Sequence, residues 1–448
     1  MRLEELRPVA LRLAAAALLT AALYGCGSAG AGTRAAASDP GLGFIGEVMN
    51  EVQKDYVVPV TRRELVEDAL RGMLTRLDPH SDYMDQQQYR QMTAVTRGQF
   101  GGIGIELTLE NRVPEVIAPI DGTPAARAGL EPGDRIIKIN GQATDGMDVE
   151  GIVKRLRGPP GTRVTLTILR ANRPPFEVDL TRRIIHVVSV KSALEPGRIG
   201  YARITTFTEN TPVELAAAIA RLKRQAHGRL NGFILDLRND PGGLLDSAVD
   251  VAGDFLDGGV VVTTRGRNPD DDHTFNAPEA GDLLPRVPMV VLVNGASASA
   301  AEIVAAALQD HHRATVIGTR TFGKGSVQSI IPMDGHGALR LTTALYYTPS
   351  GRSLQGQGVI PDIIVPVPKD EQVANAFVTH ESDLYGALRN GGSLSGTPAA
   401  APAASGAAAG DTPPIKPLLI GTSHDAQLRA AIDYLRRAVR EAAGSRGG

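Results

Sequence analysis

Between residues 198 and 368, apolar runs of strand length alternate with stretches whose apolar residues recur at helical spacing. Strands are expected in RIGYARITTF, GFILDLR, GVVVTT, PMVVLV and ATVIG, and helices in ELAAAIARLKRQA, GLLDSAVDVAGDFL and AAEIVAAALQD. Runs such as MVVLV contain no polar position, which is typical of strands buried on both faces. After them, SVQSIIPM and ALRLTTALYYTPSGRSLQG predict a hairpin, and IIVPV predicts a last strand. The pattern therefore predicts an α/β core.

The regions that flank this core have different patterns. Residues 42–96 show helical periodicity, as in ELVEDALRGMLTRL, which the turn LDPHSDYM interrupts. Residues 98–184 contain short alternating strands, glycine turns and two short helices, which is typical of a small β-rich domain. Residues 390–416 are rich in Gly, Ala, Ser and Pro, and we expect them to be disordered. The stretch AQLRAAIDYLRRAV predicts an amphipathic helix that packs on the core or on a second subunit, through Leu428, Ile432, Leu435 and Val439.

The N-terminus predicts a targeting segment. Three arginines precede the apolar run LAAAALLTAALYG, which is too short to span a bilayer and suits the core of a signal peptide. The run ends in LYGC, which resembles a bacterial lipoprotein box with Cys26 as the lipidated residue; the alternative is an ordinary signal in which Cys26 is incidental. In either case we expect a periplasmic or extracytoplasmic protein, associated with the membrane through the signal or a lipid. Residues 27–40 would form a flexible tether.

The composition excludes several functional classes. The net charge of −2, with both signs interspersed, gives no basic field, so no nucleic-acid partner is expected. A single cysteine cannot form an intramolecular disulfide, and the sequence has no Cys/His cluster of the zinc type. Neither a metal nor an organic cofactor is implied by the sequence.

The candidate chemistry lies in VNGASASAAE, where a strand is expected to end and a helix to begin. Ser297 and Ser299 stand at this turn, where a nucleophile can be exposed beside free helix N–H groups. The helix ends at His311 and His312, about 18 Å from Ser299 at 1.5 Å per residue, so neither can act as its base. A Ser-His-Asp triad that uses another histidine stays open, although no histidine–carboxylate spacing supports it.

Lysine is the other possible base, because burial lowers the pKa of an ammonium group. Lys324 lies in TFGKGSVQ, between two glycines and two apolar strands, which is an unusual place for a surface lysine. Alternation along a strand would put Gln328 on the same face, where it could hold the lysine amine. Glu302 lies one helical turn after Ser299 and could orient the pair. His80, beside a proline, is interpreted as a structural hydrogen-bonding residue.

Residues 198–365 resemble the carboxyl-terminal processing (tail-specific) proteases, peptidase family S41, which use a Ser-Lys dyad. The resemblance is carried by LDLRNDPGGLL, NGASASAAEIVAAALQD, TFGKGSVQ and LTTALYYTPSGRSLQGQGVIPD. In that family the lysine follows the serine by 25 residues and a glutamine follows the lysine by four, which selects Ser299 over Ser297. The matching catalytic positions are Ser299, Lys324, Gln328 and, three residues after the serine, Glu302.

The same resemblance assigns a role to the DPGGLL turn, where two glycines precede a helix. It implies an oxyanion hole made by the N–H groups of Gly242 and Ala300, with Gly243 as the alternative glycine. Each donor would stabilise the tetrahedral intermediate by about 3 kcal/mol. A turn without a catalytic role is the other interpretation. Two positions depart from the family pattern, Ala301 and Asp240.

Residues 98–184 resemble a PDZ domain, most specifically in GGIGIEL and AARAGLEPGDRIIKINGQ. In such a domain a loop of small residues holds the terminal carboxylate of a peptide, and the next strand pairs with that peptide. The resemblance implies a loop formed by Gly101, Gly102, Ile103 and Gly104, and an apolar pocket lined by Ile103, Ile105, Ile152 and Leu156. The alternative is a β-rich domain used only for packing.

Together the resemblances imply an α/β fold with a crotonase/ClpP-like protease core, an inserted PDZ domain and an N-terminal helical segment. The implied function is an exported serine endopeptidase that binds protein or peptide substrates by their exposed apolar C-termini and cleaves nearby. A catalytically silent PDZ adaptor and an acyl-CoA enzyme are the alternatives, and export and the PDZ domain argue against the second. An activator or adaptor protein and a homo-oligomer stay open. The expected divisions are a signal peptide (1–26), a tether and helical region (27–97), the PDZ domain (98–184), the protease cap and core (185–368) and a C-terminal region (369–448).

Overall fold

The chain forms two compact units, one up to Leu65 and one from Val66 onward. In the first unit, helix α1 (Pro40–Asp55) precedes the start of helix α2 (Arg62–Thr75), and no residue of α1 is buried. The expected signal peptide with Cys26, and most of residues 390–416, lie outside the described residues. The computed structural model describes residues 40–110, 113–120, 122–171, 173–373, 379–389, 413, 415–416 and 419–444.

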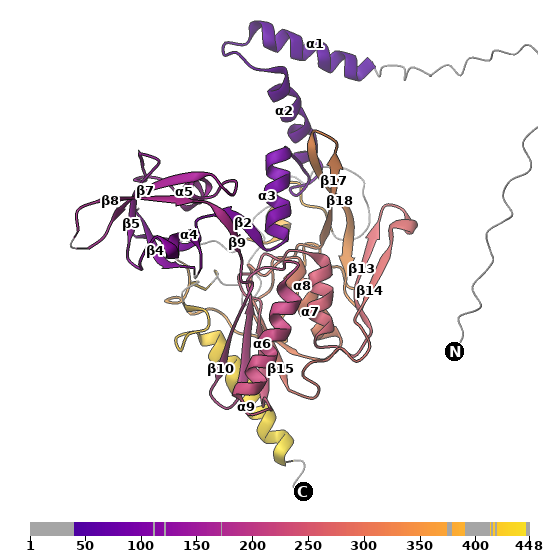
Figure 1. The fold of residues 1–448 in the computed structure, drawn as a ribbon. Coiled ribbons are helices and arrows are strands. Elements are labelled where there is room, and N and C mark those ends of the chain that lie inside the picture. The colour runs from indigo at the N-terminus through magenta and orange to yellow at the C-terminus, as the bar shows by residue number, and fades with distance from the viewer. Residues whose placement is uncertain are drawn as a thin grey trace, which may run out of the picture. The chain divides into compact units, whose positions relative to one another are not determined.

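A six-stranded sheet forms the core of the second unit, in the order β10-β11-β12-β15-β16-β19. Figure 1 labels two of its strands, β10 and β15. Its strands are β10 (Val190–Glu195), β11 (Ile199–Ile204), β12 (Gly232–Asp236), β15 (Met289–Val293), β16 (Thr315–Gly318) and β19 (Ile363–Ile364). β10 is antiparallel to β11, and the other neighbours are parallel. Every residue of β12 and β15 is buried, as expected for strands covered on both faces. The predicted α/β class is confirmed.

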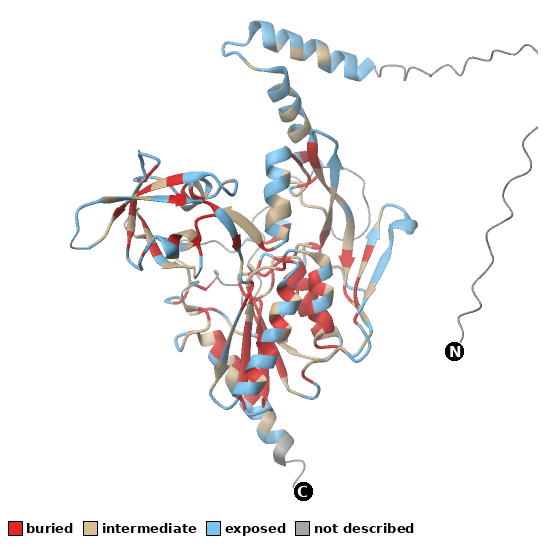
Figure 2. Cartoon of the chain, in the orientation of Figure 1, coloured by how far each residue is buried: buried red, intermediate tan, exposed pale blue. Residues whose placement is uncertain are grey.

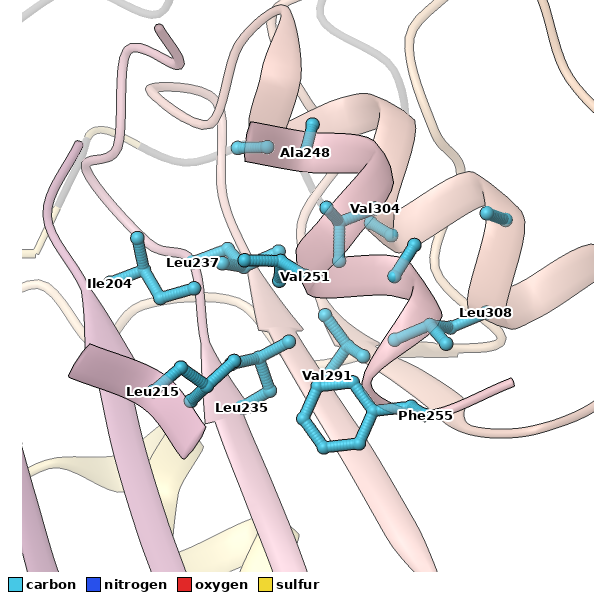
Figure 3. Packing of buried hydrophobic residues seen from close by; sticks show 14 of the residues in the cluster. Ile204, Leu215, Leu235, Leu237, Ala248, Val251, Phe255, Val291, Val304 and Leu308 are labelled. Carbon is cyan, nitrogen blue, oxygen red and sulfur yellow. The ribbon is translucent and has the colours of Figure 1, made fainter. Parts of the chain in front are cut away.

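Helices cover both faces of this sheet. Side chains alternate between the faces along each strand, so neighbouring residues of β15 pack against different helices. Val291 belongs to the apolar cluster with α6 (Thr211–Gln225), α7 (Leu245–Gly253) and α8 (Ala300–Asp310), which Figure 3 shows from close by. Val290 and Leu292 belong to the cluster on the opposite face, with α9 (Ala426–Gly444). Leu428 and Leu435 of α9 are buried there. The C-terminal helix therefore packs on the core, which decides between the two alternatives that the sequence left open.

A second sheet contains the predicted hairpin, β17 (Ser326–Met333) and β18 (Gly337–Tyr347). The other edge of β18 pairs with β1 and β13, and β13 pairs with β14. The segment LDPHSDYM thus contributes a strand beside the hairpin, followed by helix α3. These elements are β1 (Asp82–Met84), α3 (Gln86–Thr96), β13 (Val260–Gly266) and β14 (His273–Asn276), with short 3-10 turns η1 (Pro269–Asp271) and η2 (Glu381–Asp383).

The small β-rich domain has its own sheet, in the order β3-β4-β5-β7-β8, and its own apolar core. Strands β2 (Gln99–Gly102) and β9 (Arg183–His186) pair with each other where the chain enters and leaves this domain, which makes it an insertion. Figure 2 shows the buried residues of the larger core gathered in its central sheet and in α7 and α8. The remaining elements are β3 (Ile105–Glu110), β4 (Val113–Pro119), α4 (Pro124–Arg127), β5 (Arg135–Ile139), β6 (Gln142–Ala143), α5 (Val149–Leu156), β7 (Arg163–Leu169) and β8 (Phe176–Thr181).

Candidate active site

The two candidate serines have different environments at the turn between β15 and α8. Ser297 is fully buried; its hydroxyl donates to the Leu237 carbonyl at 2.7 Å and accepts from the Asn294 N–H at 3.0 Å. Ser299 is half-buried at the start of α8 and has φ +55° and ψ −113°. A non-glycine residue in such a conformation costs about 1–3 kcal/mol and is typical of functional turns. Ser297 therefore holds the turn, and Ser299 is the serine that the turn presents.

Glu302, in the first turn of α8, is fully buried and accepts four hydrogen bonds. Its Oε1 accepts from the Thr321 hydroxyl and from the Gly323 N–H, the latter at 2.7 Å. Its Oε2 accepts from the Ser299 N–H at 2.8 Å and from the Lys324 N–H at 2.9 Å. Oε2 therefore accepts from the backbone N–H of both the candidate nucleophile and the candidate base. The two amide nitrogens can be no further apart than the sum of these two distances.

The protonation of Glu302 reflects two opposing influences. Burial raises the pKa of Glu302 to about 7, against the four hydrogen bonds, which lower it. All four partners donate, so the ionised carboxylate is the form that satisfies them. Above about pH 7 Glu302 is therefore ionised and can accept from all four donors, although burial makes this charged form costly.

Lys324 is half-buried in the loop between β16 and β17. Burial lowers the pKa of its ammonium group; nearby carboxylates, Glu381 first among them, raise this pKa, and Arg340 lowers it further. The glycine after the lysine allows a close approach, because a Cβ at Gly325 would lie 2.2 Å from the Gln355 nitrogen. The surroundings thus favour the neutral amine that a general base requires.

Gln328 lies in β17 on the same side as Ser326, as alternation predicts. Its amide nitrogen donates to the Ser326 hydroxyl at 2.9 Å and to the Thr342 hydroxyl at 3.4 Å. β17 begins at Ser326, so Lys324 precedes the regular strand, and the pairing register shifts between Val327 and Gln328. The structure places Gln328 among hydroxyl groups, and its role in holding the lysine amine stays a prediction.

The DPGGLL turn packs directly against Ser299. A Cβ at Gly242 would lie 2.7 Å from the Ala298 carbonyl oxygen and 2.8 Å from the Ala300 nitrogen, so only glycine fits at this position. The Gly242 N–H donates to the Asp240 carboxylate at 2.8 Å. The structure therefore brings the two expected oxyanion donors together, but the N–H of Gly242 already has an acceptor within its own turn.

The apolar residues expected to line the peptide pocket belong to the core of the small domain. Ile103, Ile152 and Leu156 are buried in the apolar core of the small domain, and Ile105 packs against them. The expected glycine loop, residues 101–104, is shorter than predicted, because its first two residues belong to a strand.

Gly101 and Gly102 end strand β2, where they pair with Ile184 and Arg183 of β9. This pairing leaves Ile103 and Gly104 between β2 and β3. Gly104 has φ +79°, and a Cβ there would lie 2.4 Å from the Thr123 side chain.

Among the residues that the structure describes, no histidine forms a hydrogen bond with Ser299. Nε2 of His80 lies 2.9 Å from both carboxylate oxygens of Glu381, consistent with a structural hydrogen-bonding residue. Nε2 of His311 lies 2.7 Å from the Val260 carbonyl oxygen, at the far end of α8. Two residues of the site were not predicted from the sequence: Thr321, although it lies in the TFGKGSVQ motif, and Glu381, which lies in no motif.

Within the part of the chain that the structure describes, no group of three or more His, Cys, Asp or Glu residues could hold a metal ion. Among the same residues, no helix has the length and apolarity needed to cross a membrane.

Family models match successive parts of the chain. The family model "Peptidase family S41" matches residues 198–365, a PDZ domain model matches residues 115–170, and the model "Activating protease CtpB N-terminal domain" matches residues 31–88. The carboxy-terminal-processing protease of Bartonella bacilliformis is 49% identical over 78% of this chain and 80% of that protein. The carboxyl-terminal-processing protease of Synechocystis sp. is 36% identical over 73% of this chain and 76% of that protein.

A similar solved structure, the photosystem II D1 C-terminal processing protease, has 29% sequence identity and a TM-score of 0.42, over 71% of this chain and 91% of that one. The inserted small domain is a PDZ domain, and the larger α/β body is the S41 protease core. The identity to the Bartonella protein, over most of both chains, shows the family. The chain is a serine-type peptidase and belongs to peptidase family S41, the carboxy-terminal-processing proteases.

Proposed function

We propose that this chain is an exported endopeptidase in which Ser299 and Lys324 form the catalytic dyad. The observation that carries the proposal is the shared oxygen of Glu302, which accepts from the N–H groups of both residues. This arrangement fixes the relative position of a serine presented at a sharp turn and a lysine whose pKa burial lowers.

The chemistry follows from these positions. The Ser299 Oγ attacks the scissile carbonyl carbon while the neutral Lys324 amine takes the hydroxyl proton. The same ammonium then returns the proton to the leaving amine, and water hydrolyses the acyl-enzyme with Lys324 again as the base. Glu302 positions both groups through the backbone and does not touch the substrate.

The developing oxyanion needs donors beside Ser299. We propose the Ala300 N–H as one donor and a glycine of the DPGGLL turn as the other. Gly242 would first have to release Asp240, whereas Gly243, the alternative in the same turn, is free of that requirement.

The PDZ domain supports a proposal for the substrate. A strand added at β3 would place the carboxylate of a protein's C-terminus near Ile103 and Gly104, with apolar side chains toward the buried isoleucines of the domain. Export, membrane association through the N-terminal segment or a lipid on Cys26, and dependence on an activator or on self-association complete the proposal.

Cleavage by the full chain tests the dyad. An unfolded protein with an apolar C-terminus is incubated with wild type, Ser299→Ala and Lys324→Ala, and with the exposed-site controls Ser423→Ala and Lys369→Ala. We expect the wild type and both controls to cut, and both dyad variants to lose cleavage at least about 1,000-fold. Cleavage by either dyad variant at the wild-type rate would contradict the assignment. Binding without cleavage by wild type would favour a silent adaptor.

A further inference from the structure

Glu381, on η2, is a buried carboxylate that lies outside every recognised motif. Both of its oxygens lie 2.9 Å from Nε2 of His80, and its side chain is only 1% exposed. The Gln355 amide nitrogen donates to its Oε1 at 3.0 Å. The carboxylate is therefore held by two side chains, His80 from the N-terminal part of the chain and Gln355 from the protease core.

This cluster also holds the loop that carries Lys324, at residues that Glu302 does not contact. The Gln355 side-chain oxygen accepts from the Gly325 N–H at 2.9 Å, next to Lys324. The Glu381 N–H donates to the Phe322 carbonyl at 2.9 Å. Glu381 thus fixes the lysine loop on both sides of Lys324. The backbone N–H of Glu381 binds Phe322, and its carboxylate binds Gln355, whose side-chain oxygen binds Gly325.

His80 is itself fixed independently of Glu381. Its carbonyl accepts from Nε of Arg340 at 2.9 Å, and its N–H donates to the Asp78 carboxylate at 2.8 Å. Asp78 also accepts from the Thr342 hydroxyl of β18 at 3.0 Å. These hydrogen bonds fix the turn that places the His80 imidazole beside Glu381.

We propose that the His80–Glu381 pair is a positioning element for Lys324. The pair holds the lysine loop through Gln355, and it determines how much negative charge lies near the lysine amine. The inference rests on the proposed Ser-Lys function. Glu381 and His80 are positioning residues because neither touches the reacting atoms in this account.

The charges around Lys324 come from four elements. Glu381 of η2, Glu302 of α8 and Asp78 before β1 stabilise the ammonium, whereas Arg340 of β18 destabilises it. Of the three carboxylates, Glu381 has the largest effect on the pKa of Lys324, which it raises. His80 lies within hydrogen-bonding distance of both Glu381 oxygens, where an N–H at its Nε2 partly neutralises their negative charge. Removing Glu381 should therefore favour the neutral amine, and removing His80 should favour the ammonium.

The test measures Lys324 itself as well as catalysis. Full-length wild type, Glu381→Gln, Glu381→Asp, His80→Ala and the double variant His80→Ala/Glu381→Gln are pulse-labelled with an amine-reactive reagent across a pH series. Peptide mass spectrometry then gives the midpoint of Lys324 labelling, whether or not a variant cuts substrate, and thermal unfolding identifies any variant that is not folded. Glu279→Gln, at an exposed site, is the matched control.

We expect Glu381→Gln to move the Lys324 midpoint to lower pH by about half a unit or more, which is roughly a threefold change in the neutral fraction on the acid side. His80→Ala should move it to higher pH, the double variant should follow Glu381→Gln, and Glu381→Asp should keep the wild-type midpoint with slower cleavage. Unchanged midpoints in Glu381→Gln and His80→Ala, or shifts in the same direction in both, would overturn the inference. Loss of the proposed function would appear separately, as cleavage that does not depend on Lys324.

Discussion

Glu302→Gln separates the stability of the site from its chemistry. The substitution keeps the shape of the side chain but replaces one acceptor oxygen by an NH₂ donor. In the native site each oxygen accepts two hydrogen bonds, so two donors lose their acceptor whichever way the amide turns. If the NH₂ group faces the Oε2 position, the backbones of Ser299 and Lys324 are no longer tied together.

The effect on stability has the opposite sign to the usual expectation for a lost hydrogen-bond network. The folded pKa of Glu302 is about 7 and its ordinary value is 4.5, so the folded state binds a proton more tightly than the unfolded chain. The contribution of Glu302 to the free energy of unfolding is therefore largest below pH 4.5 and is lost as pH rises to about 7, by roughly 3 kcal/mol. The neutral glutamine has no such dependence.

We therefore expect urea unfolding at pH 5 and pH 8 to show a shift of about 2 to 3 kcal/mol in favour of Glu302→Gln, relative to wild type, between the two pH values. Cleavage at pH 8 should nevertheless fall about 100-fold or more, because small displacements of catalytic groups have effects of this size. Glu279→Gln, on the surface, should change neither quantity. Equal pH dependence of unfolding in wild type and variant, or near-wild-type cleavage, would refute the reasoning.

Four further predictions follow from individual contacts. Cleavage should rise with pH through the lowered pKa of Lys324, and Lys324→Arg should stay inactive over the whole pH–rate profile because a guanidinium does not lose its proton. Gly242→Ala should abolish cleavage and lower the melting temperature, because its Cβ would lie 2.8 Å from the nitrogen of Ala300; a fully active variant would contradict this contact. Asp425→Asn should cost about 3 kcal/mol in urea unfolding, since the fully buried Arg238 loses a bidentate partner on the C-terminal segment, and an unchanged midpoint would count against that role. Amidation of an apolar peptide's C-terminus should weaken its calorimetric binding to the full chain at least about tenfold, whereas equal affinity would exclude carboxylate recognition.

The local pattern predicted most of the central fold because its information is contained within single elements. Continuous apolar runs such as MVVLV gave the buried strands, and helical periodicity gave α6, α7, α8 and α9. The pairing of β18 with β1 and β13 was not predicted, since no local pattern specifies an antiparallel partner far away in the sequence. The periodic stretch ELVEDALRGMLTRL also contains Met73 and Leu77, which are both more than half exposed, so periodicity alone did not predict which of its apolar residues are buried.

The site was predictable where a residue's role depends on spacing along the chain, and not where it depends on tertiary contacts. Glu302 could be placed near Ser299 from one helical turn, but its hydrogen bonds to Thr321 and to the lysine loop depend on how a later segment folds back. The same limit applies to Asp240, whose carboxylate accepts the N–H expected for the oxyanion, and to Glu381.

The central claim is that Ser299 is a nucleophile activated by Lys324. A serine-reactive phosphonate, incubated with the full chain at alkaline pH and mapped by peptide mass spectrometry, tests this claim most directly. The account predicts a single adduct on Ser299, formed more slowly as pH falls and lost in Lys324→Ala, with Ser297 unlabelled. An adduct on another residue, or labelling of Ser299 at the wild-type rate in Lys324→Ala, would contradict it.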